Sequence, residues 1–201
     1  MSKSSRYVMA AIVAMTANAG PLHAQGNSAA GLDAEIETTY VTAGGKTITT
    51  PGHYYRSRSG KAREDSPIGS IITDLRSGTV TLLNPATKEA KVIVTAGQPR
   101  ASAAVAAGAF VPFEQAIVDG HPVKKARTTG NAGQVQEMWT AQDLGLVVFS
   151  KVEWPDFSMT KVLRNVAVRE PVAELFKIPS EYQVTHETVR PAPPAPVRAR
   201  R

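Results

Sequence analysis

Short runs that alternate hydrophobic and polar residues fill the chain from residue 32 to residue 169. In the run AEIETTYVT, which spans 34–42, Ile36 and Tyr40 fall on one side of an extended chain and Glu35 falls on the other. Alternation with a period of two is typical of a strand that buries one face. Gly, Asn, Asp and Pro separate the runs, and these residues favour turns. The pattern therefore predicts a mainly β protein.

The turns and the interruptions of this pattern are also visible in the sequence. Asp119-Gly120 is the strongest turn signal, because Asp-Gly is favoured in two-residue hairpin loops. The strand GHYYRS is expected to end in a turn over 57–60. An alanine-rich stretch at 96–115 is expected to form a short helix or a flap, and a turn of helix is expected at 172–176. With so few helices to cover it, the sheet is expected to curl into a curved antiparallel half-barrel with one or two short helices.

The start of the chain has a different pattern, that of a secretory signal peptide. Lys3 and Arg6 precede the apolar run Val8–Ala17, and small residues follow it. A positive start, a short apolar run and small residues at a cleavage point make up such a signal. Cleavage after Ala19 and after Ala24 both fit, and the second is favoured. The sequence predicts a signal peptide over the first 24 residues and export to the periplasm.

The net charge of +6 is concentrated at the two ends of the chain. Residues 25–189, expected to form a single antiparallel β domain, balance 17 bases against 17 acids. The Pro- and Arg-rich tail 190–201 is expected to be disordered. Nucleic-acid binding needs a concentrated positive surface, so no nucleic-acid partner is predicted. The basic stretch GHYYRSRSGKARED is interpreted as a hairpin whose mixed charges meet water.

The sequence contains no pattern typical of an active site. It has no cysteine, which excludes disulfides and cysteine nucleophiles. The histidines His23, His53, His121 and His186 lack the spacing of metal ligands. The segment VTAGGKT resembles the end of a phosphate-binding loop, but the first glycine of that motif is replaced by Tyr40. No enzymatic activity, metal or cofactor is predicted.

The second half of the chain carries a family resemblance. EMWTAQDLGLVVFSK, followed by TKVLRNVAVREPVAELFKIPSEYQV, resembles a set of exported bacterial proteins of unknown function. The matching elements are Trp139, Leu144-Gly145-Leu146, Asn165-Val166, Pro171, Leu175-Phe176, Ile178-Pro179 and Tyr182. The resemblance covers roughly residues 35 to 185, and this set is similar in architecture to the lipoprotein carriers of the LolA/LolB type. It implies a curved antiparallel sheet, an incomplete barrel, closed by helices over an apolar cavity.

The concave face of such a sheet is expected to carry a ligand site. Seven apolar residues in strand-like runs are expected to contribute to one interior: Ile36, Tyr40, Ile72, Val80, Leu82, Trp139 and Val148. The predicted function is that of an exported binding protein that holds a lipid or acyl chain there. The alternative is a non-enzymatic envelope interaction or stress-sensing protein that docks a protein partner.

One charged residue raises a separate question about this interior. Arg164 shares the alternation of Val162 and Val166, so it falls on an apolar face. The favoured interpretation is a rim position with a buried stem and a solvated head. The other interpretation is a buried cation that waits for an acidic group of a ligand.

Overall fold

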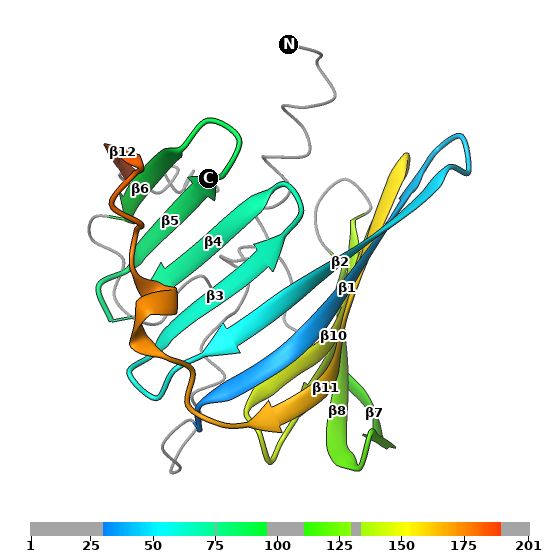
Figure 1. The fold of residues 1–201 in the computed structure, drawn as a ribbon. Coiled ribbons are helices and arrows are strands. Elements are labelled where there is room, and N and C mark those ends of the chain that lie inside the picture. Colours follow the sequence, from blue (N-terminus) through cyan, green and yellow to red (C-terminus); the bar gives the residue numbers. More distant parts are fainter. Residues whose placement is uncertain (1–29, 75, 96–110, 130–133, 190–201) are drawn as a thin grey trace, which may run out of the picture.

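The computed structural model describes residues 30–74, 76–95, 111–129 and 134–189 (Figure 1). The predicted signal peptide and the predicted disordered tail lie outside the described residues, as does most of the alanine-rich stretch. Within the described residues, all the strands belong to one open, curved sheet. The expectation of a mainly β, half-barrel fold is therefore confirmed.

The strands follow one another along the chain with short connections. Their bounds are β1 (Leu32–Thr42), β2 (Thr47–Arg56), β3 (Lys61–Ser66), β4 (Gly69–Asp74), β5 (Thr79–Asn84), β6 (Glu89–Thr95), β7 (Val111–Val118), β8 (His121–Thr129), β9 (Val135–Ala141), β10 (Leu146–Trp154), β11 (Phe157–Val168) and β12 (Gln183–Val189). Their order in the sheet is β12-β6-β5-β4-β3-β2-β1-β11-β10-β9-β8-β7. Strand β1 therefore joins the two hairpin series, because it pairs with β2 on one side and β11 on the other.

Three details differ from the expectations. The last strand, β12, runs parallel to β6, so the sheet is not antiparallel throughout. In place of the expected short helices, the described residues contain only one 3-10 turn, η2 (Ala173–Phe176). The end of the alanine-rich stretch, from Val111 on, belongs to β7 rather than to a helix or flap.

Local sequence signals explain the turns. Asp119 and Gly120 both adopt positive φ angles, 49° and 81°, as a two-residue hairpin loop with the twist of its strands requires. Gly60 also has a positive φ, 85°, in the turn after β2. Both predicted turns are confirmed.

Strand β2 is continuous through its Pro-Gly pair. Pro51 pairs with Glu37 of β1, and β3 pairs with β2 only from His53 onward. A proline lacks an N–H, so it is tolerated where a strand has a single neighbour. Gly52 is needed for space, because a Cβ there would lie 2.3 Å from the carbonyl oxygen of Asp65. Only glycine allows the two backbones to approach this closely.

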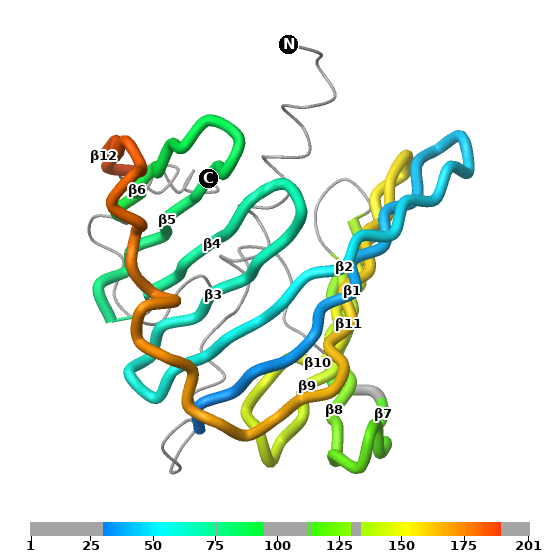
Figure 2. Tube along the Cα trace, in the orientation of Figure 1, coloured from blue at the N-terminus to red at the C-terminus, as the bar shows by residue number. Residues whose placement is uncertain are grey.

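The sheet bends so that one face is concave (Figure 2). Lys161 of β11 reaches Glu64 of β3, with Nζ 2.6 and 2.7 Å from the two carboxylate oxygens, although β1 and β2 lie between them. Side chains three strands apart can meet only on the inner side of a curve. We therefore call the face that carries Glu64 and Lys161 the concave face, and the other the convex face.

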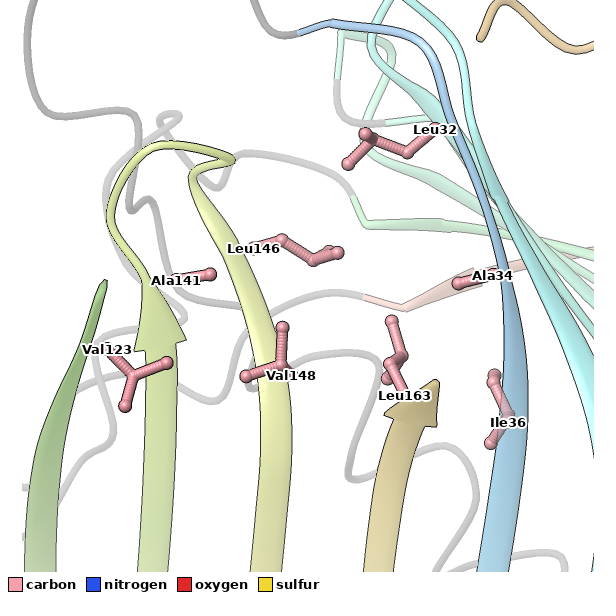
Figure 3. Close-up of a cluster of buried hydrophobic side chains, with 8 residues drawn as sticks. All are labelled: Leu32, Ala34, Ile36, Val123, Ala141, Leu146, Val148 and Leu163. Atoms are coloured by element: carbon pink, nitrogen blue, oxygen red, sulfur yellow. The ribbon is translucent and has the colours of Figure 1, made fainter. Parts of the chain in front are cut away.

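Apolar residues are buried on both faces. The concave cluster comprises Leu32, Ala34, Ile36, Val123, Ala141, Leu146, Val148 and Leu163. These side chains extend from β1 and from β8–β11 toward a shared interior (Figure 3). The convex cluster comprises Ile72, Leu83, Ala90 and Phe176, with Tyr55, Leu175, Ile178 and Tyr182 packed against it. Phe176 and its neighbours come from η2 and the segment after it, which crosses the convex face of β3–β6 (Figure 1).

Candidate functional site

The residues predicted to form an apolar interior do not all meet in one place. Ile36 and Val148 belong to the concave cluster. Val80 and Leu82 lie farther along the concave face, on β5, where Leu82 pairs with Ile71 and both β5 residues are partly buried. The concave face therefore carries predicted residues on both sides of the bend. Their role in ligand binding stays a prediction.

Ile72 lies on the opposite face from Val80 and Leu82 of the neighbouring strand β5. It belongs to the convex cluster, whereas its neighbour Ile71 pairs with Leu82. Both isoleucines are buried, with 8% of Ile71 and 5% of Ile72 exposed. Two adjacent buried isoleucines leave the alternation ambiguous in the sequence. Only the cover supplied by Phe176 shows why the second of them is buried.

Of the two aromatic residues of the predicted set, Trp139 packs against the concave cluster, whereas Tyr40 does not belong to it. Trp139 stacks on Phe149, with ring centroids 4.2 Å apart. Its indole N–H donates to Glu137 at 2.6 Å, and the ammonium of Lys125 lies 4.4 Å from the ring centroid. Tyr40 lies toward the β1–β2 turn, with its ring 6.0 Å from that of Phe157. Both aromatics are partly buried and suited to report on a nearby ligand.

Charged and polar side chains also lie on the concave face, among the apolar ones. The Glu64–Lys161 pair is largely buried, with 23% and 17% of the side chains exposed. Burial raises the pKa of Tyr54 to about 12; Arg56 lowers it and the charge of Glu64 adds to the rise. Burial and the charge of Glu64 also raise the pKa of Tyr40. The phenols therefore remain neutral hydrogen-bonding groups at physiological pH.

Arg56 is a buried cation that the sequence interpretation missed. Only 7% of the residue is exposed. Its Nη2 donates to the carbonyl of Leu144 at 2.6 Å, its Nη1 to that of Gly145 at 2.8 Å, and its Nε to that of Ala30 at 3.4 Å. Burial lowers its pKa from the ordinary arginine value, and the electrostatic interaction with Tyr54 offsets this in part. The stretch 52–65 is thus not simply a solvated hairpin, and the available signal was the shared alternation of Arg56 and the apolar Tyr54.

Arg164 is exposed to solvent, in keeping with the solvated head in the interpretation favoured for it. Its side chain is 55% exposed and lies 3.6 Å from Glu37. A β-bulge explains why it does not share the face of Val166. Strand β11 carries one residue more than β1 between the pairs Arg164–Glu35 and Ala167–Asp33, and Asn165 there has a φ of 52°. Val166 consequently packs against the concave cluster, while Arg164 turns to solvent.

A polar group on the convex side links β1 and β2 to the end of β11. The carboxylate of Asp33, only 9% exposed, contacts His53 and Arg169, with Arg169 Nε at 2.6 Å. Burial raises the pKa of Asp33, but the hydrogen bonds and charges of His53 and Arg169 outweigh burial and hold the pKa below its usual value. The group therefore connects strands through an ionised carboxylate.

Two open hollows lie beside the β7–β8 turn, one of about 370 Å³ lined by Asp119, His121, Arg164, Asn165 and Val166, and one of about 250 Å³ that includes Ile117 and Val123. Among the described residues, no group of three or more acidic or histidine side chains could hold a metal ion. No helix in the described part of the chain is long and apolar enough to span a membrane.

Comparisons with known proteins show a fold rather than a family. No family model and no curated protein matches this sequence. An uncharacterized conserved protein from Thermus thermophilus has a similar structure, with a TM-score of 0.57 at 7% identity over 89% of this chain and 99% of that protein. MucB is also similar, with a TM-score of 0.52 at 12% identity over 88% of this chain and 65% of MucB. At these identities the likenesses establish the fold alone.

The similarity to lipoprotein carriers is likewise a similarity of fold. LolA superfamily protein NE2245 from Nitrosomonas europaea is similar to this chain over 82% of its length and 97% of that protein, at 6% identity and a TM-score of 0.39. The expected half-barrel fold is confirmed by the curved, open sheet itself. A TM-score of this size carries no argument about function.

Proposed function

We propose that this protein is an exported periplasmic binding protein, without catalytic activity, that holds an acyl chain of a lipid against the concave face of its half-barrel. Export is supported by the secretory pattern at the start of the sequence. The half-barrel fold gives a curved sheet, and the apolar residues of its concave face would contact the acyl chain.

One observation carries the proposal: among the described residues, every buried member of the concave cluster belongs to a strand. In the described part of the chain, the only segment that lies across a face of the sheet is η2 with its flanks, and it lies on the convex face. The concave cluster extends from β1 to β8 (Figure 3). An acyl chain along this lining gains about 0.8 kcal/mol for each methylene removed from water.

The first experiment is a titration of the protein lacking its first 24 residues with cis-parinaric acid, a fatty acid that fluoresces in apolar surroundings. We expect saturable binding, accompanied by a change in the emission of Trp139. Leu82→Arg should weaken binding at least about ten-fold, because a charge placed on the concave face is costly to cover with an acyl chain. Ile68→Arg is the matched control, since Ile68 is 59% exposed in the β3–β4 turn. Absence of saturable binding to the wild-type protein would overturn the proposal.

A second candidate function is the docking of an envelope protein. The observation in its favour is the likeness to MucB, which has been crystallised in complex with MucA(peri). The edge strand β12 adds support, because all of its residues are exposed and an exposed edge can pair with an extended peptide. Native mass spectrometry of protein purified from its own periplasm separates the two functions. A lipid-sized added mass favours the first, and a protein-sized added mass favours the second.

A further inference from the structure

Among the described residues, Arg56 is the one buried cation, and no acidic partner lies within ion-pair distance of it. Lys161 pairs with Glu64, and Lys91 pairs with Glu187. Arg56, by contrast, has backbone carbonyls as its described hydrogen-bond partners. A buried charge is normally paired with a charge of opposite sign, because removal from water is costly. A cation without one is therefore a signal of a missing anion.

The hydrogen bonds of Arg56 leave part of its guanidinium available. An arginine has five N–H donors, and three of them have acceptors here, one on each nitrogen. One N–H on each terminal nitrogen thus remains without a described acceptor. Paired N–H groups of a guanidinium match the two oxygens of a carboxylate or a phosphate. Its carbonyl partners also fix the group in place, which lowers the entropy cost of binding.

The position of Arg56 fits the end of an amphiphile. In the sheet register Arg56 lies opposite Leu32, which is fully buried in the concave cluster. Leu144, whose carbonyl accepts from Arg56, packs against the same cluster. An acyl chain lying along the cluster would therefore have its polar end beside the guanidinium. Arg164, the cation singled out in the sequence, is exposed and faces Glu37.

We infer that Arg56 anchors the anionic head of the bound ligand, a carboxylate or a phosphate, while the concave cluster holds its acyl chain. The inference rests on the proposed acyl-binding function and specifies its ligand as an anionic amphiphile. Neutral lipids of the same chain length should bind less tightly. The carboxylate and phosphate sources share this chemistry and are separated by the ligands used below.

The test compares ligands that differ only in the charge of the head. Binding of cis-parinaric acid is measured against its methyl ester, and displacement by lysophosphatidic acid is measured against monoacylglycerol. The wild-type protein should prefer the charged member of at least one pair by about ten-fold or more, as expected for a charge-assisted, paired hydrogen bond. A preference in the first pair identifies a carboxylate and a preference in the second a phosphate. This comparison needs no variant.

Variants then assign the preference to Arg56. Arg56→Gln should abolish the preference for the charged ligand and leave the affinity for the ester unchanged. Arg56→Lys should retain part of it, because the charge stays while the paired geometry is lost. Arg164→Gln is the matched control and should behave as the wild type. Thermal unfolding confirms that each variant is folded; if Arg56→Gln is not, the wild-type comparison and Arg56→Lys decide.

Each contrary result has a separate meaning. If wild type binds charged and neutral ligands equally, Arg56 is not an anion anchor, although acyl binding stands. If Arg56→Gln weakens acid and ester by the same factor, Arg56 acts only by holding the Leu144–Gly145 turn, and the inference is overturned. If no ligand of either kind binds, the proposed function fails and the inference fails with it.

Discussion

The two faces of the sheet bury their apolar residues by different means. On the convex face, the protein covers its own strands with η2 and the following segment, which the Arg63 guanidinium holds through the carbonyl of Leu175 at 2.7 Å. On the concave face, the described cluster is formed by the curvature of the sheet, which brings β1 toward β8–β11. The convex cluster is therefore an ordinary core, whereas the concave face is the one that we propose binds a ligand. This difference predicts that equivalent substitutions on the two faces have unequal effects.

The largest effect is expected from placing a charge on each face. Ile72→Arg should unfold the protein, because an unpaired charge beneath Phe176 costs several kcal/mol against a typical total stability of about 5–15 kcal/mol. Leu82→Arg should leave a folded protein that has lost acyl binding, since Leu82 is only partly buried. Circular dichroism and ligand titration measure the two outcomes. Equal loss of structure in both variants would remove the distinction between the faces.

A smaller change on the convex face, the removal of the Phe176 ring, tests the same comparison. Phe176→Ala should lower the free energy of unfolding by about 3–5 kcal/mol, because a buried phenyl ring leaves a cavity. Val172→Ala, at a side chain that is 64% exposed just before η2, should change it by less than about 0.5 kcal/mol. Urea denaturation gives both values. A loss below about 1 kcal/mol for Phe176→Ala would mean that the segment does not contribute to the core.

The ion pair across the concave face should contribute less than the convex core. In a double-mutant cycle with Glu64→Gln and Lys161→Met, we expect a coupling energy of about 1–3 kcal/mol, since the pair is mostly shielded from water. The exposed pair Arg164–Glu37, treated in the same way, should give less than about 1 kcal/mol. Equal coupling in the two cycles would argue against a closed concave face around Glu64.

The smallest effect concerns pH and the convex polar group. The pKa of Asp33 lies below the ordinary value of about 3.9, so the contribution of its ionised form is fully present above that value and is lost as the pH falls through the lower pKa of the folded state. Asp33→Asn should therefore cost about 1 kcal/mol at pH 7, with the difference from wild type shrinking in acid. Urea denaturation from pH 7 to pH 2 measures it. A difference that stays constant over this range would show that the carboxylate charge is not responsible.

Sequence signals that act over a few residues predicted most of the strands and turns, but not β12 or the start of β7. Asp119-Gly120 supports positive φ at both loop positions, so the hairpin could be predicted without knowledge of the rest of the chain. The alternation around Ile36 likewise predicted a buried face of β1, which the structure confirms. The helical turn expected at 172–176 appears as a 3-10 turn one residue shorter. These features depend on local backbone preferences, which the residues themselves carry.

Only the tertiary structure shows on which face of the sheet each residue is buried. The alternation could not separate Ile71 from Ile72, and the bulge at Asn165 reversed the face of Val166 relative to Arg164. The burial of Arg56 depends on the Leu144–Gly145 turn, which lies 88 and 89 residues farther along the chain. The parallel pairing of β12 with β6 depends in the same way on a distant partner. The sequence therefore determined most of the strands, but the curvature of the sheet decided which side chains share a face, because burial and charge pairing depend on neighbours that only the folded chain brings together.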